Sequence, residues 1–581
     1  MSAGGGLSAP PRPSSAPPGK ETAPRASALV ARLPAWAITA AAAIAYVIAA
    51  PPSPDLAAAS YRASLFSSAG FTLWDNSWYG GHHLPAYSLL APALGAWIGP
   101  QPLAAISMIF ATALFARLID GVFPVRATRI AAAWFAIGAS VALLSSRVPF
   151  DLGLALGLGA LVLVRRGHRW VGLALGVLTA LASPVAGAFL ALAFLTWALV
   201  GPASAPRAPS ATDQHVWHAR VWHARVWPAL LTLAALVPIL ALAVAFPEGG
   251  TQPFAPSAFY PALAGVAAIG LLLEAEHRLL RVGAAVYALA LIGAFALPTA
   301  VGGNADRLGA LAAGPIAACA LACASRWRRR ALIVLAPALL YWQANAPVAD
   351  FAAAAGDPSV NSSYYAPLVG ELRALGVGYG ARPARIEVVA TADHWEARWL
   401  AGHVMIARGW ERQLDTYRNG LFYEEATPLT AARYHAWLTQ NAISYVALPD
   451  ASLDYSAQVE ARLLRGRRPH GVGAQAPSYL HEVWHSRHWR LFAVLGAAPL
   501  AQAPAQLASA THDSFTLSAP RAGSFTVRLR FTPYWALASG HGCVSAGREG
   551  WTQVQARGAG RLHVVIDFSL ARVLDHGPRC R

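Results

Sequence analysis

The sequence predicts a polytopic α-helical membrane protein whose C-terminal part is an extracytoplasmic domain, with an α/β part followed by a β-sandwich. Three observations predict this fold class. Of the 581 residues, 56% are hydrophobic and only 13% are charged, and the mean hydropathy is +0.42, whereas a soluble domain carries roughly 25% charged residues. Long apolar runs fill the chain before residue 350. Strand-like and helix-like patterns alternate after it.

The net charge is strongly positive, because 45 Lys and Arg residues face 28 Asp and Glu residues, which gives +17. In a soluble chain such an excess would suggest binding to nucleic acid. Here the arginines of the first 350 residues lie between the apolar runs, as expected for the loops that connect membrane-spanning helices. We therefore expect membrane lipids as partners and no nucleic acid.

Eleven apolar segments are long enough, or nearly so, to cross a hydrocarbon core of about 30 Å as helices. They lie near residues 34–51, 101–117, 128–145, 148–164, 170–183, 185–201, 228–246, 258–274, 280–298, 308–324 and 331–349. We divide the continuous run 170–201 at Ser183 and Pro184, because proline removes a backbone donor and disfavours helix at the preceding residue. A single long helix there would reverse every later crossing.

The distribution of basic residues predicts the orientation. Alternating loops from a cytoplasmic N-terminus place nineteen Lys and Arg inside and leave only Arg62, Arg147 and Arg307 in the short outer loops. This strong positive-inside signal predicts a multi-pass protein with its N-terminus in the cytoplasm. Eleven crossings then place the region after residue 350 outside.

Four regions follow from these patterns. Residues 1–32 are rich in Pro, Ser, Ala and Gly and should form a disordered cytoplasmic tail. Residues 33–350 form the transmembrane domain, 351–504 an extracytoplasmic α/β domain and 505–581 a β-sandwich, which we expect to be structural or to face carbohydrate. Because Cys543 and Cys580 bracket strand-like runs in an oxidising place, we predict a disulfide between them.

The first outer loop, 52–87, is the richest candidate site. It contains Trp74, Asp75, Asn76, Trp78, Tyr79, His82 and His83, with two glycines between the last aromatic and the histidines. Together these residues offer a base or metal ligand, aromatic faces for sugar rings and room for a close backbone approach. The alternative is an interfacial aromatic belt with one solvated aspartate.

At this point the sequence resembles the GT-C superfamily of polytopic glycosyltransferases. A cytoplasmic tail, a first helix and a long outer loop with Trp-Asp and Gly-Gly carry the resemblance, together with 301–308, 394–397, 407–415 and 531–535. The sequence is most similar to actinobacterial membrane proteins catalogued as "6-pyruvoyl-tetrahydropterin synthase-related" and to envelope proteins of the YfhO type. This resemblance covers most of the chain. It implies that the protein lies in the bacterial plasma membrane.

The resemblance implies transfer of a sugar from a polyprenyl-phosphate donor to an envelope glycan, lipid or protein on the outer face. It implies that Asp75 is the general base, with Trp74, Asn76, Trp78, Tyr79, His82, His83 and Asn304 as substrate contacts. The phosphate's charge would be stabilised by arginine or by a divalent ion. Arg307 is the candidate, because a guanidinium presents a fork to phosphate oxygens; the alternative is a topology charge or a partner of Asp306.

The first loop has Trp-Asp-Asn where better-known GT-C proteins have two nearby acids, which weakens a metal-dependent mechanism. Adjacent histidines seldom bind one ion well, although His82 and His83 could complete a site with Asp75. We expect no tightly bound metal and leave a weakly bound divalent cation open.

A second cluster of charged residues lies in the external domain. His394, Glu396 and Arg412 stand near Arg408, Glu411 and Asp415, beside three tryptophans. This density is consistent with an acceptor surface above the membrane cavity. The alternative is a salt-bridged helix face, because Arg408 with Arg412 and Glu411 with Asp415 follow helical spacing.

Two other functions compete with sugar transfer. A transporter or lipid flippase is disfavoured, because the acids of the membrane region fall in loops or at helix ends and not at mid-membrane depth. A non-catalytic envelope scaffold of the same fold stays open, because fold does not imply function.

Overall fold

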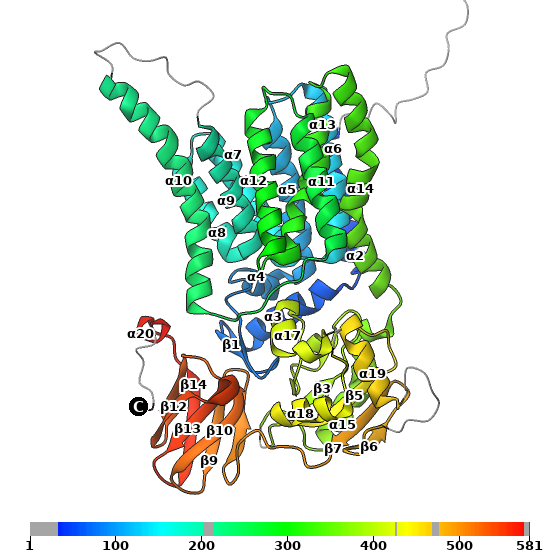
Figure 1. Cartoon of the computed structure of the whole chain (residues 1–581), viewed down its shortest axis with the longest axis vertical. Helices are drawn as coiled ribbons and strands as arrows, with labels where there is room; N and C mark the ends of the chain where they lie inside the picture. Colours follow the sequence, from blue (N-terminus) through cyan, green and yellow to red (C-terminus); the bar gives the residue numbers. More distant parts are fainter. Residues whose placement is uncertain are drawn as a thin grey trace, which may run out of the picture.

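A computed structural model of the chain describes residues 33–201, 214–380, 382–424, 427–466, 476–574 and 580. The expected tail, 1–32, lies outside the described residues. Figure 1 shows a bundle of long helices with two smaller lobes at one end, an α/β lobe and a β-sandwich. The segment 52–99, which contains the expected first outer loop, lies between the bundle and the two lobes.

Each of the eleven expected apolar segments coincides with a helix. These helices are α2 (Ala35–Ala49), α5 (Pro100–Ile119), α6 (Val125–Ala142), α7 (Val148–Arg165), α8 (Arg169–Ala182), α9 (Pro184–Val200), α10 (Gln214–Ala245), α11 (Pro256–Leu272), α12 (Arg278–Ala296), α13 (Arg307–Leu321) and α14 (Arg326–Ala354). Among the described residues, six helices are long and apolar enough to cross a membrane, or seven if one bent pair counts as a span. Eleven crossings and their orientation therefore stay predictions.

The run 170–201 is divided at Ser183. Helix α8 ends at Ala182 and α9 begins at Pro184, and the Ser183 hydroxyl accepts a hydrogen bond from the Ala186 amide at 3.3 Å. Proline at the first position of α9 leaves no amide donor to satisfy there. The local sequence thus ends one helix and begins the next.

The first outer segment is not the loop that the sequence led us to expect. It contains helix α3 (Pro54–Ala69), a hairpin of β1 (Trp74–Asp75) and β2 (His82–His83), and helix α4 (Ala91–Ile98). Ser53 caps α3 by accepting from the Leu56 amide at 3.3 Å, and α3 bends by 73° from α2. Its apolar side chains pack against the α/β domain, so hydropathy alone did not mark it as a helix.

The α/β domain is built on a five-stranded sheet in the order β4-β3-β5-β7-β6. The strands are β3 (Arg385–Val388), β4 (Met405–Ile406), β5 (Ile443–Pro449), β6 (Leu480–His485) and β7 (Trp489–Val494). The first three are parallel and the last two antiparallel. Helices α15 (Ser362–Ala374) and α16 (Glu396–Trp399) belong to one core, and α18 (Ala431–Gln440) and α19 (Gln458–Leu464) to the other. The sheet is therefore covered on both faces.

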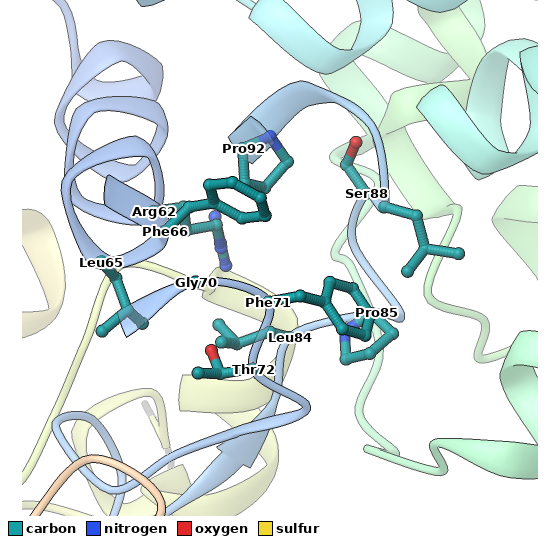
Figure 2. A pocket seen from close by; sticks show the side chains of 11 residues that line it. Arg62, Leu65, Phe66, Gly70, Phe71, Thr72, Leu84, Pro85, Ser88 and Pro92 are labelled. Atoms are coloured by element: carbon teal, nitrogen blue, oxygen red, sulfur yellow. The ribbon is translucent and has the colours of Figure 1, made fainter. Parts of the chain in front are cut away.

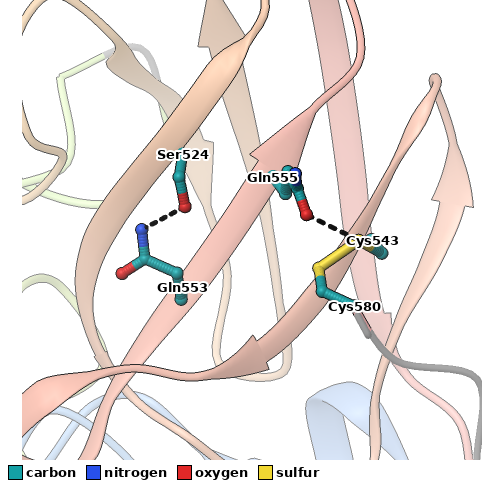
Figure 3. Close-up of a disulfide and its surroundings, with 5 residues drawn as sticks. All are labelled: Ser524, Cys543, Gln553, Gln555 and Cys580. Carbon is teal, nitrogen blue, oxygen red and sulfur yellow. Dashed lines mark hydrogen bonds between the residues drawn. A yellow bond between two sulfur atoms is a disulfide. The ribbon is translucent and has the colours of Figure 1, made fainter.

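The β-sandwich has a three-stranded sheet, β10-β13-β12, and a four-stranded sheet, β11-β14-β9-β8. Its strands are β8 (Gln506–Ala510), β9 (Ser514–Ala519), β10 (Gly523–Arg530), β11 (Trp535–Ser539), β12 (Gly542–Ala546), β13 (Trp551–Ala556) and β14 (Gly560–Ile566). The predicted disulfide between Cys543 and Cys580 is present (Figure 3) and joins β12 to the end of the chain. Trp74 of the hairpin inserts into the sandwich core.

Candidate functional site

Asp75, the predicted base, lies on the hairpin and has no exposed surface. The Tyr61 hydroxyl donates to its Oδ2 at 2.9 Å, and the Ser77 amide donates to its Oδ1 at 2.9 Å. Both carboxylate oxygens thus accept hydrogen bonds from the protein. In this structure the carboxylate orders the hairpin, and an acceptor hydroxyl has no open side from which to reach it.

The neighbours of Asp75 tie the hairpin to the β-sandwich. Trp74 donates from Nε1 to the Asn76 side-chain oxygen at 2.8 Å, and Asn76 donates from Nδ2 to the Thr511 carbonyl at 2.9 Å. The Trp74 bond orients the Asn76 amide within the hairpin, and the Asn76 bond to Thr511 then fixes the hairpin on the sandwich.

The aromatic residues of the hairpin are core residues rather than open sugar platforms. Trp78 is fully buried, with His82 stacked at a ring-centroid distance of 5.2 Å and Tyr61 at 4.7 Å. The Tyr79 hydroxyl donates to the Glu411 carbonyl at 3.0 Å. The predicted aromatic contacts therefore join the hairpin to the α/β domain.

The two histidines have different partners, so they do not form one site with Asp75. The ring of His82 contacts the Asp75 backbone carbonyl at 3.1 Å. His83 lies 2.7 Å from Glu248 through Nδ1 and 2.9 Å from the Thr532 hydroxyl through Nε2. Within the described part of the chain, no group of three or more His, Cys, Asp or Glu side chains could hold a metal ion.

Glu248 is a half-buried acid, with its side chain 11% exposed, that the sequence reasoning missed. Its carboxylate pairs with Arg418 at 3.0 Å as well as with His83. Burial alone would raise the pKa of Glu248, but Arg418 and His83 outweigh that effect and lower it. The pair links the segment after α10 to helix α17 (Arg412–Arg418) and to the hairpin.

A group of charged residues lies where the bundle meets the α/β domain. We call Asp55, Arg147, Asp151, Arg307 and Asp350 the helix-end cluster. Arg147 Nε lies 3.2 Å from Asp55 Oδ2, and Arg147 Nη2 lies 3.6 Å from Asp350 Oδ2. Arg147 thus joins α3 to α14, and it makes no ion pair with Asp151, four residues along the chain.

Three members of this cluster remain partly accessible. The side chain of Asp55 is 16% exposed, that of Arg147 26% and that of Asp350 30%. Asp151, by contrast, is buried, and its Oδ2 has no hydrogen-bond partner among the described residues. The cluster therefore combines reachable charges with an unsatisfied acceptor.

Arg307 stands beside this cluster at the start of α13. Its guanidinium lies 5.5 Å from the Phe150 ring centre and interacts electrostatically with Arg147, Asp55 and Asp151. Over the described ranges, no carboxylate lies within the 4.0 Å of an ion pair with Arg307. Asp306 instead accepts from Trp342 Nε1 at 2.7 Å. Asn304 lies in the preceding 3-10 turn, η2 (Gly302–Asp306).

Asp55 and Asp350 were not predicted as site residues, and Arg147 was named only among the basic residues of the short outer loops, although a signal was present. Arg62, Arg147 and Arg307 are the three exceptions to the positive-inside distribution. Tyr87 links Arg62 to the helix-end cluster, because its ring lies 4.1 Å from the Arg62 guanidinium and it interacts electrostatically with Asp55 and Arg307. Arginines that depart from the topology rule thus gather at one place.

A small, partly open pocket with a volume of about 20 Å³ lies beside Arg62 (Figure 2). Its walls are mostly apolar and come from α3, the hairpin flanks and the start of α4: Leu65, Phe66, Gly70, Phe71, Thr72, Leu84, Pro85, Ser88, Leu89 and Pro92. Arg62 is 3% exposed and pairs with Glu411, while its Nε and Nη1 lack partners among the described residues. The pocket thus has mostly apolar walls, and the two donors of Arg62 that are unpaired among the described residues are buried beside it.

The predicted acceptor residues of the α/β domain come together in one network. His394 Nδ1 lies 3.1 Å from Glu396, and Arg412 forms two hydrogen bonds with Asp454, at 2.6 and 2.9 Å. Burial alone would lower the pKa of His394, but its bonds to Asp454 and Glu396 raise it to about 9. Asp454, which the sequence reasoning missed, has its pKa depressed because His394 and Arg412 outweigh burial.

Arg408 continues this network, which we call the domain network: His394, Glu396, Arg408, Arg412, Asp415, Asp454 and Glu460. Arg408 pairs with Asp415 at 2.7 Å and lies 3.7 Å from Glu460. Arg408 precedes α17, so Arg408 and Arg412 do not lie on one helix. The expected helical spacing of these two residues is therefore wrong. Burial raises the pKa of Glu460 to about 7, whereas Arg408 outweighs burial at Asp415 and lowers its pKa.

The domain network lies at the carboxyl edge of the parallel strands. His394 follows β3, Arg408 follows β4 and Asp454 follows β5. After β3 the chain enters α16 on one face of the sheet, and after β5 it enters α19 on the other. Adjacent strands that lead to opposite faces form the position where α/β sheets bind ligands. Arg412, with a side chain 22% exposed, is the accessible member.

No protein-family model matches the sequence. No curated protein matches it either. Among solved structures, the chain is similar to the arabinofuranosyltransferase AftD from Mycobacteria, with 17% identity and a TM-score of 0.42 over 79% of this chain. It is also similar to the oligosaccharyltransferase AglB from Archaeoglobus fulgidus, solved with an inhibitory peptide and a dolichol-phosphate, with 14% identity and a TM-score of 0.40 over 69% of this chain. The chain spans 40% of the AftD chain and 66% of the AglB chain.

Proposed function

We propose that this protein is an integral membrane glycosyltransferase that moves a sugar from a polyprenyl-phosphate donor to an acceptor of the cell envelope. The observation that carries the proposal is the helix-end cluster. An accessible carboxylate, Asp55, stands there beside Arg147, and Arg307 makes no ion pair with a described residue. A general base and two cations are the groups that this transfer requires.

In the proposed reaction, a carboxylate of the first outer segment accepts the proton of the acceptor hydroxyl as the oxygen attacks the anomeric carbon. The bond from that carbon to the phosphate oxygen breaks, and the phosphate leaves with its charge stabilised by Arg147 and Arg307. We favour Asp55 as this base because its side chain is 16% exposed. Asp75 stays the alternative base, although it has no exposed surface.

The surroundings of the cluster fit an amphiphilic donor. The apolar walls beside Arg62 would contact the first part of the lipid chain at its surface, and Tyr87 lies between these walls and the cluster. The acceptor would lie toward the α/β domain, where Arg412 is the exposed contact beside His394 and Glu396. A weakly bound divalent cation would be an alternative to the arginines.

The non-catalytic scaffold remains the second candidate, and one observation favours it. The hairpin residues predicted to contact substrate, from Trp74 to His83, are buried and join the bundle to both lobes. A protein that only held two external domains against the membrane would need these contacts and no accessible base.

The test is transfer or hydrolysis of a panel of polyprenyl-phosphate sugars by the purified protein. We expect Asp55→Asn to lower turnover by about 10²- to 10⁴-fold, the range for loss of a general base, with an unchanged melting temperature. Asp120→Asn is the matched control, because Asp120 is exposed and directly follows α5.

If Asp55→Asn kept full turnover while Asp75→Asn lost all turnover, with both variants folded equally well, the base would be Asp75. Full turnover in both variants would overturn the carboxylate assignment, and no turnover by the wild type with any donor would favour the scaffold.

A further inference from the structure

The end of the β-sandwich nearest the bundle carries an apolar patch that packing within the described residues leaves uncovered. Phe568 is 48% exposed, Leu570 76% and Leu574 66%. Phe568 follows strand β14, and Leu570 begins the short helix α20 (Leu570–Val573). Three large apolar side chains in seven residues form a patch of the kind that marks an interaction surface.

The patch is held in place rather than loosely attached. Arg572 is buried in the same turn, and it donates from Nη1 to the Pro533 carbonyl at 3.2 Å and to the Trp535 carbonyl at 3.0 Å. Its Nε also lies 3.3 Å from Asp567. Because these bonds fix the backbone, the neighbouring apolar side chains point outward as part of the fold.

The patch packs against the end of a candidate membrane span. The Phe568 ring stacks on Phe246 at a centroid distance of 6.0 Å, and Phe246 comes directly after the last residue of α10. The Tyr534 hydroxyl also donates to the Ala245 carbonyl. Figure 1 shows α20 on the side of the sandwich that faces the lower end of α10.

That end of α10 has the character of a lipid-facing surface. The segment Val226–Ala245 has a mean hydropathy of 2.4, and Leu240 and Val244 are 62% and 66% exposed on it. An exposed tryptophan, Trp97, ends α4 at the same end of the bundle, as expected for a residue at a membrane interface. Phe246 itself is buried between the patch and the span, so the exposed side of the patch lies beside an apolar span and has lipid as its natural occupant.

We infer that Phe568, Leu570 and Leu574 insert into the interfacial zone of the bilayer and anchor the β-sandwich to the membrane. Apolar side chains at the headgroup boundary bind in proportion to the area they bury. The anchor would hold the sandwich beside α10, and the sandwich core in turn holds Trp74 of the hairpin. The occupant is the bilayer itself and not the sugar donor, so this inference stands independently of the proposed function.

The test uses a photo-crosslinking amino acid placed at one position at a time in the full chain, reconstituted as single copies in phosphatidylethanolamine and phosphatidylglycerol nanodiscs. Positions 570 and 574 report on the patch, and position 240 on α10 is the positive control. Position 483 is the negative control: Val483 is 42% exposed on β6, which Figure 1 shows away from the bundle. Mass spectrometry then measures the yield of lipid adducts.

We expect lipid adducts at 570 and 574 in a yield comparable with position 240, and none above background at 483. Adducts at 570 and 574 no more abundant than at 483 would overturn the inference. Crosslinks from 570 and 574 to the protein's own chain would also overturn it, because they would mean that protein and not lipid covers the patch.

Discussion

The helix-end cluster and the domain network contain the same kinds of side chain but use them differently. In the domain network, Arg408 and Asp415 are both buried and lie 2.7 Å apart. In the helix-end cluster, Arg147 and Asp55 are partly exposed and 3.2 Å apart, while Arg307 has no ion-pair partner among the described residues. Charges that pair closely in the interior hold a fold together, whereas charges left accessible and unpaired can bind a substrate.

This comparison predicts its largest effect for the loss of a buried partner. Arg408→Met should lower the free energy of unfolding by about 3–5 kcal/mol, because Asp415 and Glu460 would be left as buried and uncompensated charges. Thermal melting of the purified protein measures it. Arg147→Met is the matched control and should cost under about 1 kcal/mol, because that pair is partly exposed to water. Equal losses in the two variants would mean that the two regions do not differ.

A smaller effect, on activity rather than stability, is expected in the helix-end cluster. Arg307→Met should lower kcat/KM for the lipid-linked donor by about 10- to 150-fold, the equivalent of about 1.5–3 kcal/mol for one hydrogen bond to a charged group. The melting temperature should stay unchanged. Arg278→Met, an exposed arginine at the start of α12, serves as the control. Unchanged kcat/KM in Arg307→Met would remove this arginine from the phosphate contact.

The smallest predicted effect is a pH dependence that arises in the domain network. The pKa of His394 is about 9 in the folded protein and 6.5 ordinarily. Its contribution to the free energy of unfolding is therefore complete below pH 6.5 and is lost as the pH rises through 9. We expect the free energy of unfolding to fall by on the order of 1–2 kcal/mol between pH 7 and 9.5. The melting temperature measured across this pH range tests the expectation. His394→Asn should flatten this dependence. A wild-type melting temperature that rises over that range would contradict the assignment.

The sequence predicted the bundle well because each apolar helix carries its own signal. Hydropathy identified all eleven helical segments, and Ser183 with Pro184 divided α8 from α9 through a local cap. The disulfide of Cys543 with Cys580 followed from compartment and strand pattern. Helix α3 was missed, because a bend of 73° separates it from α2 and its buried face packs against the α/β domain.

The candidate site was predicted less well, because burial depends on contacts between distant segments. Asp75 stood in the richest loop of the sequence, yet Tyr61 and Ser77 use both of its oxygens. The residues around Asp55 carry no motif that points to a site. Its role as the accessible acid depends on Arg147, which is 92 residues away in the sequence and lies beside it in the fold.

The sequence by itself thus determined which segments are apolar helices, where the long apolar runs end and which cysteines pair, because these depend on local composition and periodicity. Only the tertiary structure decided which charged residues are buried and which stay accessible. The reason is physical: the environment of a carboxylate or guanidinium is set by groups brought to it from elsewhere in the chain, and no local pattern records them.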